Sequence, residues 1–231
     1  MTSVRYAVSV MSGDLTNLQQ TIRALEEIGI ETLHIDVIDD VFSPSMPIGL
    51  ETAMRIRQIT DLSLDAHVMS VNNELLVRQM INAGMDSITF HQETTLHIDH
   101  LISLIRNAGK RVGIGLNPAT SLSVLDFILP QVDTVCVMLI NPGYATDANE
   151  RQVPYAVTKV QRLHELISEQ RLEVGIQVDG RVSFETIPGL IAAGATGLVL
   201  GSSSIFRKGR TLQENKQLLD RVIGGSVGRD A

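Results

Sequence analysis

Short runs of aliphatic and β-branched residues recur along the whole chain, separated by longer stretches with apolar residues three or four positions apart. The runs are almost continuously apolar, which is typical of strands covered on both faces in a parallel sheet. They predict eight strands: Tyr6–Val10, Thr32–Asp36, Ser63–Val68, Ser87–His91, Arg111–Leu116, Thr134–Met138, Glu173–Val178 and Gly197–Leu200.

The stretches between these runs have the period of a helix. In the first of them, the apolar residues fall on one face of a helix and leave the other face polar: Leu15, Leu18, Ile22, Leu25 and Ile28. The same reasoning predicts helices that include Leu15–Ile28, Leu75–Ala83, Leu101–Ala108, Ala156–Glu169 and Leu212–Val222.

The spacing of the strands tests the fold. The predicted strands end at residues 10, 36, 68, 91, 116, 138, 178 and 200, in steps of 26, 32, 23, 25, 22, 40 and 22 residues. Such steps fit strand–helix units, and eight of these close a (β/α)8 TIM barrel of class α/β. The main rival is a doubly wound open sheet, which usually has a glycine-rich turn after its first strand, and residues 9–14 have no such run. The long step leaves residues 141–154 as a loop able to cover a site.

This pattern predicts one domain. We expect residues 1–223 to form a single barrel, and the Gly- and Ser-rich residues 224–231 to form a flexible C-terminal tail.

Composition narrows the class of protein further. Of the 231 residues, 44% are hydrophobic, enough to bury a core, and the net charge is −7. An acidic protein does not attract nucleic acid or an anionic membrane, so neither is expected as a partner. No apolar run approaches the ~20 residues that span a bilayer. The single Cys136 cannot form an intramolecular disulfide, which indicates a cytoplasmic protein and leaves enzymes, binding modules and scaffolds open.

Residues able to bind a metal lie at the ends of three predicted strands. His34 and Asp36 are two residues apart on one strand and point to the same side of it. His67 lies near the end of the next strand, and Asp179 follows the seventh. Functional groups of a barrel sit where its strands end, so these four residues can converge on one divalent cation: Zn, Fe(II), Mn or Co.

From Ser9 to Phe206 the chain resembles the ribulose-phosphate 3-epimerase family. The matching segments are weak singly but specific in this order on eight strand–helix steps: residues 9–14 (SVMSGD), 34–39 (HIDVID), 67–69 (HVM), 88–93 (ITFHQE), 116–120 (LNPAT), 137–138 (VM), 141–143 (NPG), 178–180 (VDG) and 201–202 (GS).

The resemblance implies a ribulose-phosphate-binding barrel that catalyses metal-dependent epimerisation at C3 of a ketose phosphate. The reaction would proceed by two-aspartate proton transfer through an enediolate, with a base on one face of the carbon and an acid on the other. A cation would stabilise the enediolate charge. The implied metal ligands are His34, Asp36, His67 and Asp179, and the implied acid/base pair is Asp36 and Asp179.

The resemblance also implies a set of substrate contacts. Backbone N–H groups after strands 7 and 8, with the start of a short helix, are expected to hold the phosphate. His91 and Glu93 match the family, and we expect them to form a structural hydrogen bond near the pocket. The substrate-binding residues are expected to be Ser9, His67, Met69, Met138, Gly143, Gly180, Arg181, Gly201 and Ser202.

The chain departs from the family in its specificity positions. Arg181 and Asp40 stand where the family has glycine, and residues 144–152 form a longer loop. The substrate could therefore be ribulose 5-phosphate, allulose 6-phosphate or a rarer ketose phosphate. Two alternatives remain: a non-catalytic sugar-phosphate-binding barrel, and a related sugar-phosphate lyase. The lyase is disfavoured because such relatives carry a lysine at strand 2 or 3, and none occurs between Met1 and Asn107. Barrels of this family often associate, so we expect a homo-oligomer.

Overall fold

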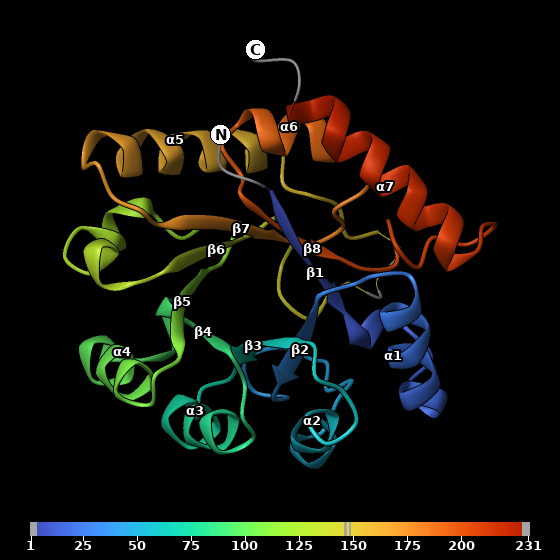
Figure 1. The fold of residues 1–231 in the computed structure, drawn as a ribbon. Helices are drawn as coiled ribbons and strands as arrows, with labels where there is room; N and C mark the ends of the chain where they lie inside the picture. Colours follow the sequence, from blue (N-terminus) through green and yellow to red (C-terminus); the bar gives the residue numbers. More distant parts are fainter. Residues whose placement is uncertain (1–3, 146, 148, 228–231) are drawn as a thin grey trace.

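The computed structural model describes residues 4–145, 147 and 149–227. Eight parallel strands pair in chain order, and β1 also pairs with β8, which closes the sheet into a barrel surrounded by helices (Figure 1). The predicted (β/α)8 barrel is confirmed. The strands are β1 (Arg5–Ser9), β2 (Thr32–Ile38), β3 (Ser63–Met69), β4 (Ser87–His91), β5 (Arg111–Leu116), β6 (Thr134–Met138), β7 (Gly175–Asp179) and β8 (Gly197–Leu200).

The strand register decides which side chains share the barrel interior. Across β2 and β3, His34 pairs with Asp65 and Asp36 pairs with His67. His34 also approaches Asp179 of β7, a strand it does not pair with, so these side chains point into the barrel. Leu33 and Ile35 alternate with these residues along β2 and so point outward, where they share one apolar core with residues of the surrounding helices.

The helices cover the outside of this barrel. Ile22 and Leu25 of the first helix are fully buried and belong to the same apolar core as the outward faces of the strands. The α-helices are α1 (Leu18–Glu27), α2 (Leu50–Ile56), α3 (Asn73–Asn82), α4 (Ile98–Asn107), α5 (Ala156–Glu169), α6 (Ile187–Ala192) and α7 (Leu212–Val227). Short 3-10 helices are η1 (Val10–Ser12), η2 (Leu15–Asn17), η3 (Gln92–Thr94), η4 (Leu122–Leu125) and η5 (Leu129–Gln131), the last two connecting β5 to β6.

Most differences from the predicted elements lie at helix boundaries. The predicted helix Leu15–Ile28 begins as η2, because Asp14 accepts a hydrogen bond from the Thr16 backbone N–H and caps that turn separately. The last helix continues to Val227, so residues 224–227 are helical rather than part of a tail. There the Ser226 hydroxyl donates to the Val222 carbonyl at 2.6 Å. The rest of the predicted tail, 228–231, lies outside the described residues.

A search of the described residues finds no helix with the length and apolar character needed to cross a membrane.

Candidate active site

The candidate site is a cavity at the end of the barrel where the strands finish. Its wall is formed by side chains and loops that follow β1, β2, β3, β6, β7 and β8. The lining residues are Ser9, Met11, Ser12, Asp36, Ile38, Met69, Met138, Ile140, Pro142, Gly143, Ala145, Asp179, Gly180, Arg181, Val182, Val199, Gly201, Ser202 and Ser203.

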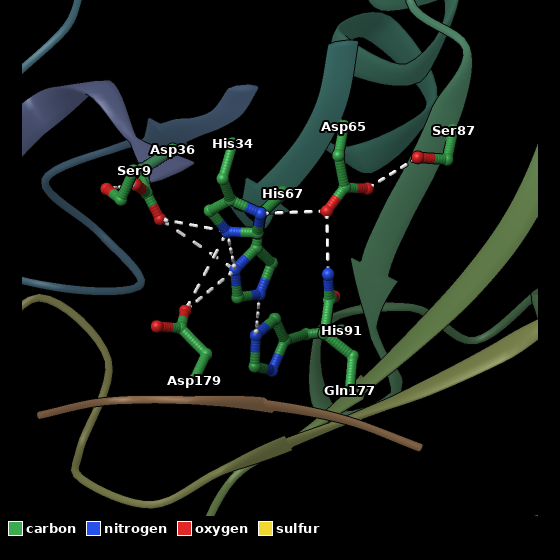
Figure 2. Close-up of polar contacts among 9 residues, drawn as sticks. All are labelled: Ser9, His34, Asp36, Asp65, His67, Ser87, His91, Gln177 and Asp179. Carbon is green, nitrogen blue, oxygen red and sulfur yellow. Dashed lines mark hydrogen bonds and ion pairs between the residues drawn. The ribbon is translucent and has the colours of Figure 1, made fainter. Parts of the chain in front are cut away.

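At the base of this cavity, four potential metal-ligand atoms lie within 4.8 Å of one another, one each from His34, Asp36, His67 and Asp179. The His34 Nε2 atom is 3.3 Å from His67 Nδ1 and 3.4 Å from Asp36 Oδ1. Asp179 Oδ2 is 3.3 Å from His67 Nδ1 and 3.8 Å from His34 Nε2. Figure 2 shows both carboxylates directed at the two imidazoles.

These separations fit a single bound cation. Four ligands placed tetrahedrally about 2.1 Å from a zinc ion would be about 3.4 Å apart. The five separations reported among these atoms run from 3.3 to 3.8 Å. Two imidazoles and two carboxylates suit zinc, iron(II), manganese or cobalt. The arrangement can hold a divalent metal ion.

A hydrogen bond on the side of the ring that faces away from the cluster orients His34 (Figure 2). Its Nδ1 atom is 2.8 Å from Asp65 Oδ2, and Asp65 also accepts hydrogen bonds from Ser87 and Gln177. Burial opposes protonation of His34, but Asp36 and Asp65 outweigh it and raise its pKa well above the ordinary value. Burial also disfavours the charged form of Asp65, yet these hydrogen bonds hold its pKa below the usual range.

His67 is oriented through a second imidazole. Its Nε2 atom is 2.9 Å from His91 Nε2, and His91 Nδ1 is 3.1 Å from Glu93 Oε2. Burial lowers the pKa of His91 to about 4, which favours the neutral ring. Burial opposes ionisation of Glu93, but hydrogen bonds from His91 and Thr120 hold its pKa at about 2.

Asp36 and Asp179 differ in their surroundings. The Ser9 hydroxyl donates to Asp36 Oδ2 at 2.6 Å, which fixes this carboxylate and leaves Oδ1 directed at the cluster. Burial disfavours the charged form of Asp36, but His34 and then His67 outweigh this effect and lower its pKa. The Asp179 side chain is 15% exposed, against 5% for Asp36, so it is the more open of the two carboxylates.

The loops after β7 and β8 form the other end of the cavity. Gly180 has a φ of +113° and Arg181 a φ of +49°, so the chain turns in a left-handed conformation directly after Asp179. The Arg181 Nη2 atom donates to the carbonyls of Ala145 and Asp147 in the loop after β6. The expected short helix after β8 is instead a series of turns. There the Ser204 and Phe206 N–H groups donate to the Gly201 carbonyl.

Nearly all predicted site residues line the cavity. Those lining it besides the two aspartates are Ser9, Met69, Met138, Gly143, Gly180, Arg181, Gly201 and Ser202. His67, predicted to contact substrate as well as metal, is fully buried and lies behind the carboxylates rather than on the wall.

Sequence reasoning missed three residues that support the cluster: Asp65, Ser87 and Gln177. A signal for two of them was present, because Asp65 and Gln177 lie two positions before His67 and Asp179 and so share their inward faces. Ser87 has no such signal, since it opens β4 and reaches Asp65 only across the barrel register.

Fold and site together define a (β/α)8 barrel with a two-histidine, two-aspartate centre of the metal-binding type at the carboxyl ends of its strands. The sequence profile of the ribulose-phosphate 3 epimerase family matches residues 5–206. The chain belongs to this family, as its resemblance had indicated.

Individual relatives agree with this assignment. The chain is 34% identical to the chloroplastic ribulose-5-phosphate-3-epimerase of Arabidopsis thaliana, in a match covering 84% of this chain and 69% of the relative. It is 33% identical to the ribulose-phosphate 3-epimerase of Methanocaldococcus jannaschii, in a match covering 95% and 92%.

Solved structures with low sequence identity share the fold. KGPDC from Streptococcus mutans has a TM-score of 0.68 at 14% identity, in a match covering 98% of this chain and all of that chain. The 3-hexulose-6-phosphate synthase from Salmonella typhimurium has a TM-score of 0.66 at 14% identity, in a match covering 96% of this chain and 99% of that chain. At this identity the likeness establishes the barrel alone.

Proposed function

We propose that this protein is an isomerase that epimerises a ketose phosphate at C3, with one divalent metal ion as cofactor. The observation that carries the proposal is the convergence of His34, Asp36, His67 and Asp179 beside an open cavity. Family membership supports the same reaction class, since the relatives described above are named ribulose-phosphate 3-epimerases.

Two carboxylates facing one space suit the proton chemistry of epimerisation. A hydrogen at C3 is removed from one face of the carbon and returned to the other, so the site needs a base and an acid on opposite sides. Asp36 on β2 and Asp179 on β7 approach the centre from different strands and would exchange these roles with the direction of reaction. Ser9 would keep Asp36 aligned through its 2.6 Å hydrogen bond. A divalent cation held by the four residues would supply Lewis-acid stabilisation of the negative charge on the substrate oxygens.

The apolar part of the wall would exclude water from the reacting carbon. Ile38, Met69 and Met138 lie at the same end of the barrel as the two aspartates and line the same cavity. Methionine side chains adapt to the shape of a ligand, and an apolar wall strengthens the electrostatic interactions beside it.

The loops after β7 and β8 would bind the phosphate. Gly180, Gly201 and Ser202 line the cavity, as does Gly143 in the loop after β6, and their backbone N–H groups would be the donors to the anion. Arg181 adds a positive charge, and its buried Nε has no hydrogen-bond partner in the described part of the chain. Because the protein carries a net charge of −7, binding of the anion has to rely on these local groups.

Solvent-exchange NMR tests the proposal. The metal-reconstituted protein is incubated in D2O with ketose phosphates of four to six carbons, including ribulose 5-phosphate and allulose 6-phosphate. We expect loss of the C3 proton signal and appearance of the epimer with at least one substrate. Binding without exchange would favour the sugar-phosphate-binding barrel, and carbon–carbon cleavage would favour the lyase.

The acid/base roles have their own test. With metal at a concentration that saturates both proteins, Asp179→Asn should lower the exchange rate by about 100- to 10,000-fold, because an amide cannot transfer the proton. Asp126→Asn, an exposed aspartate outside the cavity, serves as the matched control and should leave the rate unchanged. Equal rates in the two variants would remove Asp179 from the proposed mechanism.

We also propose a cytoplasmic homo-oligomer with no nucleic-acid or membrane partner. Exposed apolar side chains on the segments that follow β2 and β3 support self-association. Val41 is 70% and Met46 58% exposed after β2, and Val71 and Leu75, the latter in the first turn of α3, are about half exposed after β3. Size-exclusion chromatography with light scattering measures the assembly directly, and a monomer at micromolar concentration would contradict the proposal.

A further inference from the structure

We propose that Glu93 is a positioning residue for the metal centre. Acting through His91, it selects the tautomer of His67 that leaves Nδ1 free to bind a cation. This inference rests on the proposed metal site and assigns a role to a residue that does not touch it.

The inference begins with the atom that His67 offers to the cluster. That atom is Nδ1, so the ring proton of a neutral metal-binding His67 has to lie on Nε2. His67 Nε2 is 2.9 Å from His91 Nε2. Their ring planes differ by 10° and their centroids are 5.1 Å apart, so the rings meet edge to edge in nearly one plane. His67 therefore donates, and His91 has to accept with an unprotonated Nε2.

The same logic fixes the next hydrogen bond. If His91 accepts at Nε2, its own proton lies on Nδ1, which is 3.1 Å from Glu93 Oε2. A carboxylate accepts such a proton and cannot donate one when ionised. The direction of every bond in the row from His67 through His91 to Glu93 is thus set by the carboxylate at its end.

Glu93 is itself held so that it can only accept. Its Oε1 atom accepts from the Asn117 backbone N–H at 2.7 Å and from the Thr120 hydroxyl. Lys159 holds the same loop, donating to the carbonyls of Asn117 and Pro118 at 2.7 and 3.1 Å. The loop after β5 therefore keeps Glu93 in place and presents its second oxygen to His91.

His34 provides the comparison within the same molecule. It offers Nε2 to the cluster, and its Nδ1 lies 2.8 Å from the Asp65 carboxylate, with no intervening ring. Metal-binding histidines usually donate their other N–H to a carboxylate or carbonyl, which fixes the tautomer and ring orientation. His34 meets its carboxylate directly, whereas His67 reaches one through His91.

The substitution Glu93→Gln should reverse the direction of the hydrogen bonds that join His67, His91 and residue 93. In Glu93→Gln, the amide oxygen has to face the Asn117 N–H, which leaves the NH2 group directed at His91. His91 would then accept at Nδ1 and carry its proton on Nε2, opposite His67 Nε2. His67 would move its own proton to Nδ1 and lose its free metal-ligand atom.

The first test measures proton positions in the unmodified protein. Imidazole 15N NMR of the zinc-loaded chain should show His91 protonated at Nδ1 and unprotonated at Nε2, with His67 protonated at Nε2. The opposite tautomer of His91 would overturn the inference, and this result does not depend on any variant folding.

The second test measures metal affinity. Titration of metal-free protein with Zn²⁺ or Co²⁺ should show that Glu93→Gln binds about 10- to 100-fold more weakly than wild type, the range found for supporting residues of metal sites. Thr120→Val is the matched control: it removes the other side-chain contact of Glu93 but leaves its bond to His91, so its affinity should remain close to that of wild type.

The outcomes separate the two proposals. If wild type binds metal and Glu93→Gln binds it equally well, the positioning role fails and the metal site stands. If Thr120→Val loses as much affinity as Glu93→Gln, Glu93 only supports the loop and the inference fails. If wild type binds neither ion, the proposed metal centre fails and this inference fails with it.

Discussion

The imidazole of His91 is closely packed against the neighbouring strand β5. The His91 ring lies opposite Gly115 of β5, with which it is paired in the sheet register. A Cβ atom at residue 115 would be 2.9 Å from the ring, closer than packed atoms approach. The glycine at position 115 of β5 therefore leaves room for the His91 imidazole, which contacts His67.

Gly115→Ala should therefore disturb His91. We expect a loss of about 1–3 kcal/mol in the free energy of unfolding, typical of overpacking, together with weaker metal binding. Urea denaturation and zinc titration measure the two effects. Gly189→Ala in α6, where an added Cβ meets nothing within 4 Å, should be neutral or slightly stabilising.

Arg181 combines an unfavourable backbone conformation with a position in the cavity wall, where we propose that the phosphate binds. Arg181→Gly suits the φ of +49° but removes the charge and the bonds to the Ala145 and Asp147 carbonyls. A charge-assisted contact contributes about 1.5–3 kcal/mol, so KM for a phosphorylated substrate should rise by roughly 10-fold or more. The effect on kcat should be smaller, because the proposed role of the guanidinium is to bind the phosphate and not to transfer the C3 proton.

Arg171 offers a matched control for that measurement. It also has a positive φ, of +55°, but does not line the cavity. Arg171→Gly should leave KM unchanged and slightly raise the melting temperature. An equal change in KM in both variants would show that the effect arises from backbone flexibility rather than from the guanidinium of Arg181.

At the scale of elements, a loop that carries site residues is hydrogen-bonded to a helix outside the barrel. Asn215 on α7 is 1% exposed, and its side-chain amide donates to the carbonyls of Ile205 at 3.1 Å and Arg207 at 2.9 Å. These carbonyls belong to the connection that follows Gly201 and Ser202. The last helix thus holds the loop proposed to bind phosphate.

Asn215→Ala should leave those carbonyls without their donor. Loss of buried hydrogen bonds of this kind costs about 1–3 kcal/mol, measurable as a lower midpoint in urea denaturation. Gln217→Ala, an exposed position on the same helix, should change stability by less than about 0.5 kcal/mol. Equal midpoints for the two variants would show that Asn215 does not fasten the loop.

At the scale of the whole molecule, the centre joins strands that are far apart in sequence. His34 and His67 come from β2 and β3, whereas Asp179 comes from β7. An ion bound by all of them would bind the folded chain in preference to the unfolded chain, and so would stabilise the closed barrel.

Metal should therefore raise the stability of the whole protein. At a free zinc concentration 100 times the Kd, the free energy of unfolding should increase by about 2.7 kcal/mol, which appears as a higher melting temperature in calorimetry. A chelator should reverse the shift. Asp179→Asn should show a smaller increase, and an unchanged melting temperature for wild type across a zinc titration would contradict a metal-binding centre.

The local pattern of the sequence was sufficient to place the eight strands. The bounds of β4, β5, β6 and β8 agree with the predicted strands, because the apolar runs and their flanking turn residues are local signals. The two-residue repeat of a strand also predicted that His34 and Asp36 face the same side of β2. The short helices α2 and α6, of seven and six residues, were missed because so few turns give no clear period.

Contacts across the barrel were decided only by the tertiary structure. Asp65 accepts from Gln177, 112 positions later in the chain, and His67 meets His91 because the register of neighbouring strands brings their ends together. The two-residue repeat of a strand predicts which side of the sheet a residue faces. It does not predict the position of that residue along the barrel axis or its contacts on other strands. Those depend on how eight strands tilt and close, which is a property of the assembled sheet.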